Sequence, residues 1–132
     1  MSGSGTPDDP WVLTTPAGGS SFEIHLDPDK NVLHCQVGKT WLHYRPESLD
    51  DALAMLQAHG DWMELGNKDE KQPTKEGTVE AWARSESNPV GGWYGLRKGY
   101  RGRFANYVVP ILAQQGKVTF EKRGRGWWVK AI

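Results

Sequence analysis

Short segments in the first third of the chain carry the hydrophobic pattern of β-strands. In one of them, Phe22, Ile24 and Leu26 alternate with polar residues, which is the period of a strand with one buried face. Strands are predicted on this basis at residues 11–13, 21–26, 32–37 and 40–45. The last two segments are joined by a Gly-Lys pair, as in a β-hairpin. Residues 11–47 are therefore expected to form a small antiparallel sheet.

After this sheet, the pattern changes to a helical period. Residues 48–59 place apolar side chains three and four positions apart, which predicts a helix with Ser48 as its N-cap and Gly60 as its C-cap. Residues 78–85 predict a second, shorter helix that starts at the N-cap Thr78. Both helices precede the region in which most of the basic residues lie.

The stretch from residue 91 to residue 116 combines a Gly-rich turn, a basic cluster and an amphipathic helix. Its apolar residues recur at helical spacing, at Phe104, Tyr107, Val108, Ile111 and Leu112. We therefore expect a helix over residues 101–115, ended by Gly116. Pro110 lacks the N–H that would bond to the carbonyl of Asn106, so a kink or a restart is predicted there.

The remaining segments complete an α+β chain. A short strand is expected at residues 61–65, a charged solvated loop at 67–77, and a hairpin at 117–132 with the basic, Gly-rich tip KRGRG. The strands come first and the helices follow, which favours one α+β domain over residues 11–132. Residues 1–10 are rich in Gly, Ser, Pro and Asp and are expected to be a disordered tail.

The composition indicates the cellular compartment of this domain and the partners that are not expected. Cys35 is the only cysteine in 132 residues, so no internal disulfide is possible, and we expect a cytoplasmic protein. No apolar run approaches the length of a membrane span, so a membrane partner is not expected. No motif for a nucleotide or other cofactor is visible, and we expect none to be bound.

The net charge is zero, but the two parts of the chain differ in sign. Residues 1–83 hold 6 Lys or Arg and 14 Asp or Glu, whereas residues 84–132 hold 10 and 2, giving balances of −8 and +8. A basic segment of this kind predicts a polyanionic partner such as nucleic acid. The alternative is that the two parts pack together and neutralise each other.

The candidates for catalysis or metal binding are few. His34 and His43 are expected to face each other across the hairpin, with His25 on the preceding strand, but no carboxylate or cysteine completes a metal site at the usual spacing. We therefore predict that these histidines bind no metal. Cys35 follows His34 directly, and neighbouring strand residues point to opposite faces, which argues against a nucleophile–base pair. A small metal-assisted hydrolase remains the enzyme alternative.

The order of elements over residues 48–132 resembles that of a winged-helix domain. The resemblance makes residues 101–115 the recognition helix and residues 117–132 the wing, and it implies contacts with a DNA groove and with phosphates. The basic and polar residues that it places at the nucleic acid are Arg97, Lys98, Arg101, Arg103, Asn106, Lys122, Arg123 and Arg125. The aromatic residues beside them, which can stack on unpaired bases, are Trp93, Tyr94 and Tyr100.

A second resemblance covers most of the chain. It rests on the segments GDWMELG, GTVEAWARS, NPVGGWYG and YRGRFANYV. With these segments the chain is similar to a family of small bacterial proteins of unknown function, and this resemblance implies no activity. The sequence thus favours a nucleic-acid-binding protein, with a protein–protein interaction module without catalytic activity as the alternative.

Overall fold

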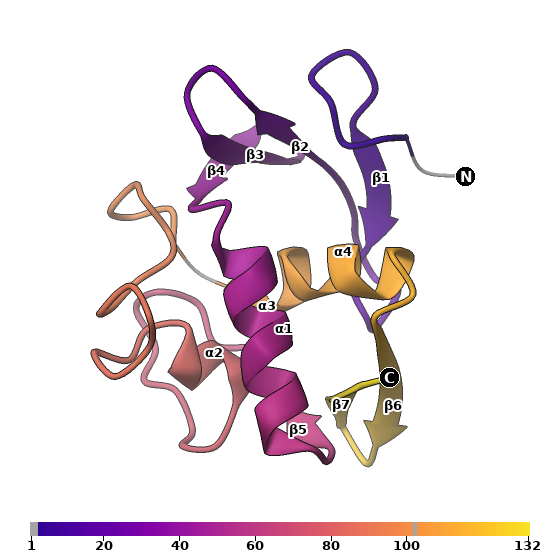
Figure 1. Ribbon diagram of the computed structural model, residues 1–132, viewed down its shortest axis with the longest axis vertical. Coiled ribbons are helices and arrows are strands. Elements are labelled where there is room, and N and C mark those ends of the chain that lie inside the picture. Colours follow the sequence, from indigo (N-terminus) through magenta and orange to yellow (C-terminus); the bar gives the residue numbers. More distant parts are fainter. Residues whose placement is uncertain (1–2, 102) are drawn as a thin grey trace.

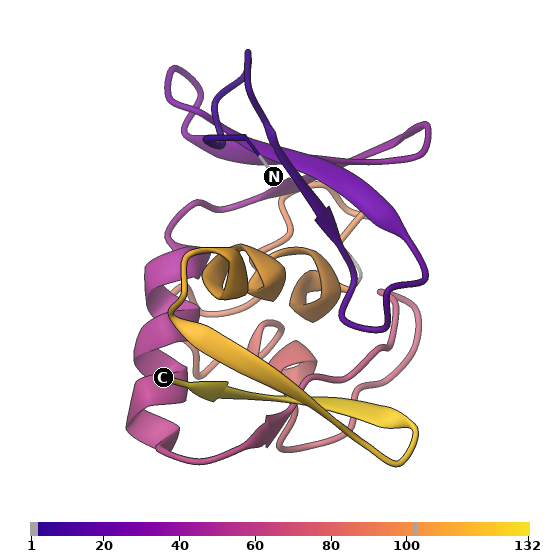
Figure 2. The same ribbon diagram turned by 90° about the vertical axis from the view of Figure 1, so that its right-hand side faces the viewer.

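The computed structural model describes residues 3–101 and 103–132 and shows two antiparallel sheets with helices between them (Figures 1 and 2). The first sheet has the strand order β1-β2-β3-β4, formed by Trp11–Thr14, Ser21–Asp27, Val32–Val37 and Thr40–Tyr44. The second has the order β5-β7-β6, formed by Met63–Glu64 (β5), Val118–Arg123 (β6) and Gly126–Ala131 (β7). The helices are α1 Ser48–His59, α2 Val79–Trp82, α3 Phe104–Tyr107 and α4 Val109–Gln114. The α+β class and the N-terminal antiparallel sheet are confirmed.

The first sheet has the predicted register. Cys35 pairs with Ile24 on one side and with Leu42 on the other, and all three side chains are buried against the helices. His34 pairs in the same way with His25 and His43, which places the histidines on the opposite, outer face. The alternation of apolar and polar residues therefore decided which face of this sheet meets the core.

The helix predicted at residues 101–115 is shorter and is broken in two. α3 ends at Tyr107, and α4 starts again after Val108, with Pro110 in its first turn, where the missing N–H of proline costs no helical hydrogen bond. Arg103 precedes α3 in a left-handed conformation with φ 58°, so this part of the prediction is wrong. Residue 102 lies outside the residues that the structure describes. In Figure 2, α3 and α4 lie between the two sheets.

The predicted caps can be compared with the structure at three helix ends. Gly60 ends α1 in a left-handed conformation, and Thr78 accepts a hydrogen bond from the backbone N–H of Ala81 at 3.1 Å, as expected. Ser48 is not the N-cap: that position is Glu47, and the buried Ser48 Oγ has no hydrogen-bond partner among the described residues. α2 is a single turn, because Asn88 folds the chain back by donating to the carbonyl of Trp82 at 2.8 Å.

The elements after β4 do not by themselves support a winged-helix unit. Their order is α1, β5, α2, α3, α4, β6 and β7, but α2 is only four residues long and the following helix is interrupted. The C-terminal hairpin is part of a three-stranded sheet, because β5 pairs with β7 through Met63 and Val129.

At the other end of the chain, residues 3–10 form a turn in which the backbone N–H of Gly5 donates to the carbonyl of Asp9, and residues 1 and 2 lie outside the described part.

Candidate nucleic-acid interface

The C-terminal hairpin divides its basic residues between two faces. Lys122 is paired with Trp127, so both side chains point to one face, and both line a pocket together with Arg125. Arg123 points to the other face, where it forms an ion pair with Glu121 and lies over the rings of Trp62 and Trp128, at 5.3 and 5.1 Å from their centroids. The three cations of the hairpin tip therefore do not form one patch.

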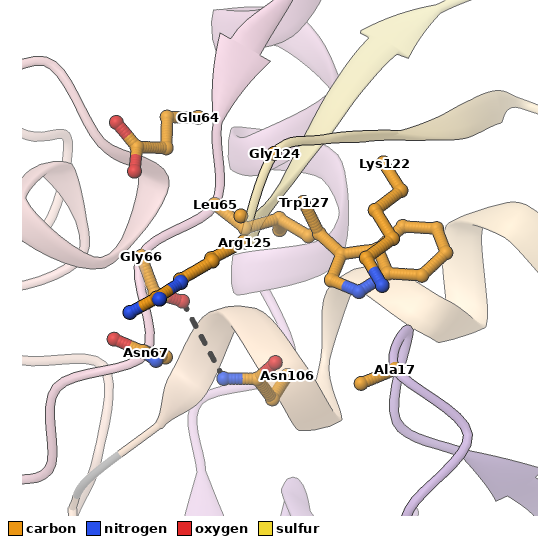
Figure 3. Close-up of a pocket in the computed structure, with 11 residues that line it drawn as sticks. Ala17, Glu64, Leu65, Gly66, Asn67, Asn106, Lys122, Gly124, Arg125 and Trp127 are labelled. Carbon is orange, nitrogen blue, oxygen red and sulfur yellow. Dashed lines mark hydrogen bonds between the residues drawn. The ribbon is translucent and has the colours of Figure 1, made fainter.

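The pocket beside Lys122 and Arg125 has a volume of about 530 Å³ and is formed by four separate segments (Figure 3). One wall is the hairpin itself, and the second is the segment that follows β5. The third is α3, which contributes Asn106, and the fourth is the β1–β2 loop, which contributes Ala17. Figure 3 shows the guanidinium group of Arg125 extending toward the segment of Gly66 and Asn67. The structure thus brings together three of the predicted site residues, from α3 and from the hairpin.

The charge of this pocket is positive. Lys122 and Arg125 are exposed, and neither is in an ion pair with any residue that the structure describes. The carboxylate of Glu64 also lines the pocket, but it is paired with the Nζ of Lys75 at 2.8 Å. The Asn106 amide donates to the Gly66 carbonyl across 3.5 Å, a weak bond that leaves its polar atoms available.

A second hollow of about 450 Å³ lies on another side of α3, between that helix, the loop that follows β5 and the β3–β4 hairpin. Arg103 and Tyr100 line it, but so do Asp69 and Glu70. The carboxylate of Glu70 accepts hydrogen bonds from the backbone N–H groups of Gly99 and Arg101, both at 2.7 Å. The loop that follows β5 therefore holds the backbone of residues 99–101 in place, and the charges of the second hollow are mixed.

Two of the remaining basic residues of this region lie against aromatic rings. Arg97 lies over Tyr100 at 4.3 Å, and Arg101 lies over Trp93 at 5.3 Å. Such contacts occupy the ring faces that a base would need. Lys98 is exposed on the same loop.

Tyr94 is part of the core. Its ring is fully buried and stacks on Trp82 and Phe104, and its hydroxyl donates to a carboxylate oxygen of Asp51 at 2.8 Å. Burial and this carboxylate raise the pKa of Tyr94 above its ordinary value. A base cannot reach this ring, so Tyr94 is not part of the interface.

A buried ion pair lies behind the pocket, and the sequence pattern did not predict it. Glu80 is 1% exposed, and its carboxylate accepts from the backbone N–H of Ala105 at 3.0 Å and from Arg84 Nε at 3.2 Å. Burial raises the pKa of Glu80. The Arg84 guanidinium also donates to three backbone carbonyls of the preceding loop, those of Lys68, Asp69 and Gln72. The loop predicted to be a solvated connector is in this way fixed to α2 and to the start of α3.

The outer face of the first sheet holds the histidines. His34 Nδ1 lies 2.8 Å from His43 Nδ1, and the rings of His25 and His34 are 5.2 Å apart. Within residues 3–101 and 103–132, no group of three or more His, Cys, Asp or Glu side chains is arranged to hold a metal ion. Cys35 lies on the buried face, where desolvation raises its pKa to about 12 and keeps the thiol protonated.

The chain belongs to a family of unknown function (DUF6855), whose profile matches residues 3–132. This confirms the predicted membership of a family without an assigned activity, whereas a bacterial origin stays a prediction. A search of curated proteins and a search of solved structures each gave no match. In the part of the chain that the structure describes, every helix is too short or too polar to cross a membrane.

Proposed function

We propose that this member of the DUF6855 family binds nucleic acid at the pocket between α3 and the C-terminal hairpin. The observation that carries the proposal is that Lys122, Arg125 and the amide of Asn106 line one pocket. Cationic side chains supply the phosphate contacts that dominate affinity for nucleic acid. Amide side chains supply donors and acceptors for base edges.

The charge balance of the pocket supports an anionic partner. Its one acidic residue, Glu64, already has a cation beside it, since Lys75 lies 2.8 Å away. The cations of Lys122 and Arg125 are therefore the groups left for a ligand. Arg103 precedes α3 and is exposed, which adds a third cation on the side of α3 that faces the second hollow.

The winged-helix resemblance enters the proposal as a mode of binding. In that mode α3 is the element presented to the nucleic acid, through Arg103 and Asn106, and the hairpin contacts the backbone through Lys122 and Arg125. Arg123 and Arg101 have a smaller part in it than the sequence suggested, because both lie over tryptophan rings. A cytoplasmic location belongs to the same proposal.

Fluorescence anisotropy with labelled oligonucleotides tests this proposal. With about three phosphate contacts, the logarithm of the affinity should fall with the logarithm of the salt concentration at a slope of about −3. The variant Lys122→Ala/Arg125→Ala should reduce the magnitude of that slope by about 1 for each phosphate that the protein no longer neutralises.

The same hairpin provides a matched control. Arg123→Ala removes a cation of the opposite face, where it is paired with Glu121, and should leave the slope nearly unchanged. The proposal is wrong if the wild-type protein shows no binding in low salt, or if the double variant and Arg123→Ala behave alike.

A protein–protein interaction module is the second candidate, and one observation favours it. Val12 and Trp41 are 53% and 40% exposed on the outer face of the first sheet. They lie at the ends of one row of paired residues across its four strands, with Glu23 and Gln36 between them. This face points away from the helices that lie between the two sheets, so a partner protein could use it without the cations. Loss of binding to a partner protein in Trp41→Ala, with that binding unchanged in Lys122→Ala, would identify this mode.

A further inference from the structure

The basic pocket is a hollow rather than a flat patch, and this shape calls for an explanation. Contacts with a phosphate backbone need only exposed cations. A volume of about 530 Å³ lies in the range of pockets that enclose a small organic molecule, roughly 300–1,000 Å³. The pocket can therefore take more of a nucleic acid than its phosphates.

The walls offer the three kinds of group that a nucleotide needs. Trp127 brings an aromatic ring that is only partly buried, on the same face of the hairpin as Lys122. Lys122 and Arg125 bring positive charge, and Figure 3 shows the Trp127 ring beside the Lys122 side chain. The amides of Asn67 and Asn106 come from two other walls, the segment after β5 and α3.

These groups are available to a ligand. The side chain of Asn67 is exposed and makes no hydrogen bond to another described residue. Among the described residues, the side chain of Asn106 makes only the 3.5 Å bond to the Gly66 carbonyl. The wall that carries Asn67 is packed from behind against the start of α2, because a Cβ at Gly66 would lie 3.0 Å from Glu80 Cβ and 3.2 Å from Thr78 Cβ. On this side the pocket is backed by the core rather than by a loop free to close it.

We infer that this pocket takes one unpaired nucleotide of a nucleic-acid strand, with the base stacked on Trp127 and the phosphate between Lys122 and Arg125. The inference rests on the proposed function and specifies its substrate as a strand with unpaired bases rather than an intact duplex. Stacking on an aromatic side chain accepts every base, because every base has a π-face. The amides of Asn67 and Asn106 then face the edge of the base.

The test compares two labelled strands of equal length and charge, one of twelve thymidines and one of twelve abasic sites. At the same salt concentration, the wild-type protein should bind the base-containing strand about tenfold more tightly, as expected for one stacked base. Trp127→Leu should remove this difference while it leaves the salt dependence nearly unchanged. Trp127→Phe, which keeps a ring, should retain most of it.

The outcomes separate the two proposals. If neither strand binds, the proposed function fails. If both strands bind equally well to the wild-type protein, nucleic-acid binding stands and the nucleotide pocket is overturned, whether or not Trp127→Leu folds. Equal preference for the base-containing strand in the wild-type protein and in a folded Trp127→Leu variant would also overturn it. A wild-type preference that is lost in Trp127→Leu and kept in Trp127→Phe is the result that supports it.

Discussion

The substitution Arg84→Ala should destabilise the protein strongly. Arg84 and Glu80 form an ion pair with side chains that are 9% and 1% exposed, so water replaces the lost partner poorly. Removing one member of a buried pair costs about 3–5 kcal/mol, because the other charge remains buried. The three backbone carbonyls that accept from the guanidinium are partly exposed, and water can take over there. We therefore expect a loss of about 4 kcal/mol, set mainly by the carboxylate.

The size of this loss should depend on pH, and the direction of the pH dependence follows from the pKa of Glu80. Burial already raises the pKa of Glu80, and removal of the guanidinium raises it further. A carboxyl group whose pKa is higher in the folded state than in the unfolded state favours folding at low pH, and this stability is lost as the pH rises through the folded-state pKa. The deficit of Arg84→Ala should accordingly be smaller at acidic pH than at neutral pH.

Urea unfolding followed by tryptophan fluorescence measures both effects. A suitable control is Arg97→Ala, because Arg97 is exposed over the ring of Tyr100 and its loss should cost less than about 1 kcal/mol. The double variant Glu80→Gln/Arg84→Ala should recover part of the loss, since a glutamine carries no charge and can still accept from the N–H of Ala105. If Arg84→Ala loses no more stability than Arg97→Ala, or if the double variant is the less stable one, the reasoning is refuted.

Two further predictions concern the first sheet and the basic loop. Burial, and next the neighbouring His34, lower the pKa of His25 and His43, so their contribution to folding stability should be full above pH 6.5 and fall as the pH drops below it. The midpoints of thermal unfolding at pH 7.5 and 5.5 should therefore differ less in His43→Gln than in the wild-type protein, and an unchanged difference would contradict this. Glu70→Ala removes the acceptor of the backbone N–H groups of Gly99 and Arg101. Amide hydrogen exchange at Gly99 should therefore accelerate about tenfold or more, while the midpoint of thermal unfolding shifts little. Unchanged exchange would show that Glu70 does not hold the loop that contains Gly99.

Local periodicity predicted the elements with one buried face. The strands of the first sheet and the position of α1 followed from it, and pairing His34 with His43 required only the short turn between the strands. The same rule, applied to the C-terminal hairpin, separates Lys122 from Arg123, since neighbouring strand residues point to opposite faces. The predicted site residues at the hairpin tip therefore divide between two faces, with Lys122 and Arg125 at the pocket and Arg123 over the ring of Trp128.

The residues whose burial periodicity did not predict are polar ones inside the core. Glu80 and Arg84 have the i, i+4 spacing of a helical ion pair, which on most helices is exposed. Only the packing of the preceding loop and of α3 against α2 buries them, and these contacts join residues far apart in the sequence. Ser48 was wrongly predicted as the N-cap: its residue type favours a cap, but the N-cap position is Glu47, which makes no side-chain cap hydrogen bond, and the serine is the first residue of the helix.

The strand order of the two sheets has a consequence for biosynthesis. The first sheet is a meander of sequential neighbours, so a nascent chain can complete it while the rest is still being translated. The second sheet cannot form in that way, because β5 pairs with β7: residues 63 and 64 can pair only after residues 128 and 129 have been synthesised. Until β7 emerges from the ribosome, Leu65 and Val79 lack part of the core that buries them in the finished protein. Translation pauses within the last strands would therefore prolong the period in which a chaperone or a protease can engage the chain.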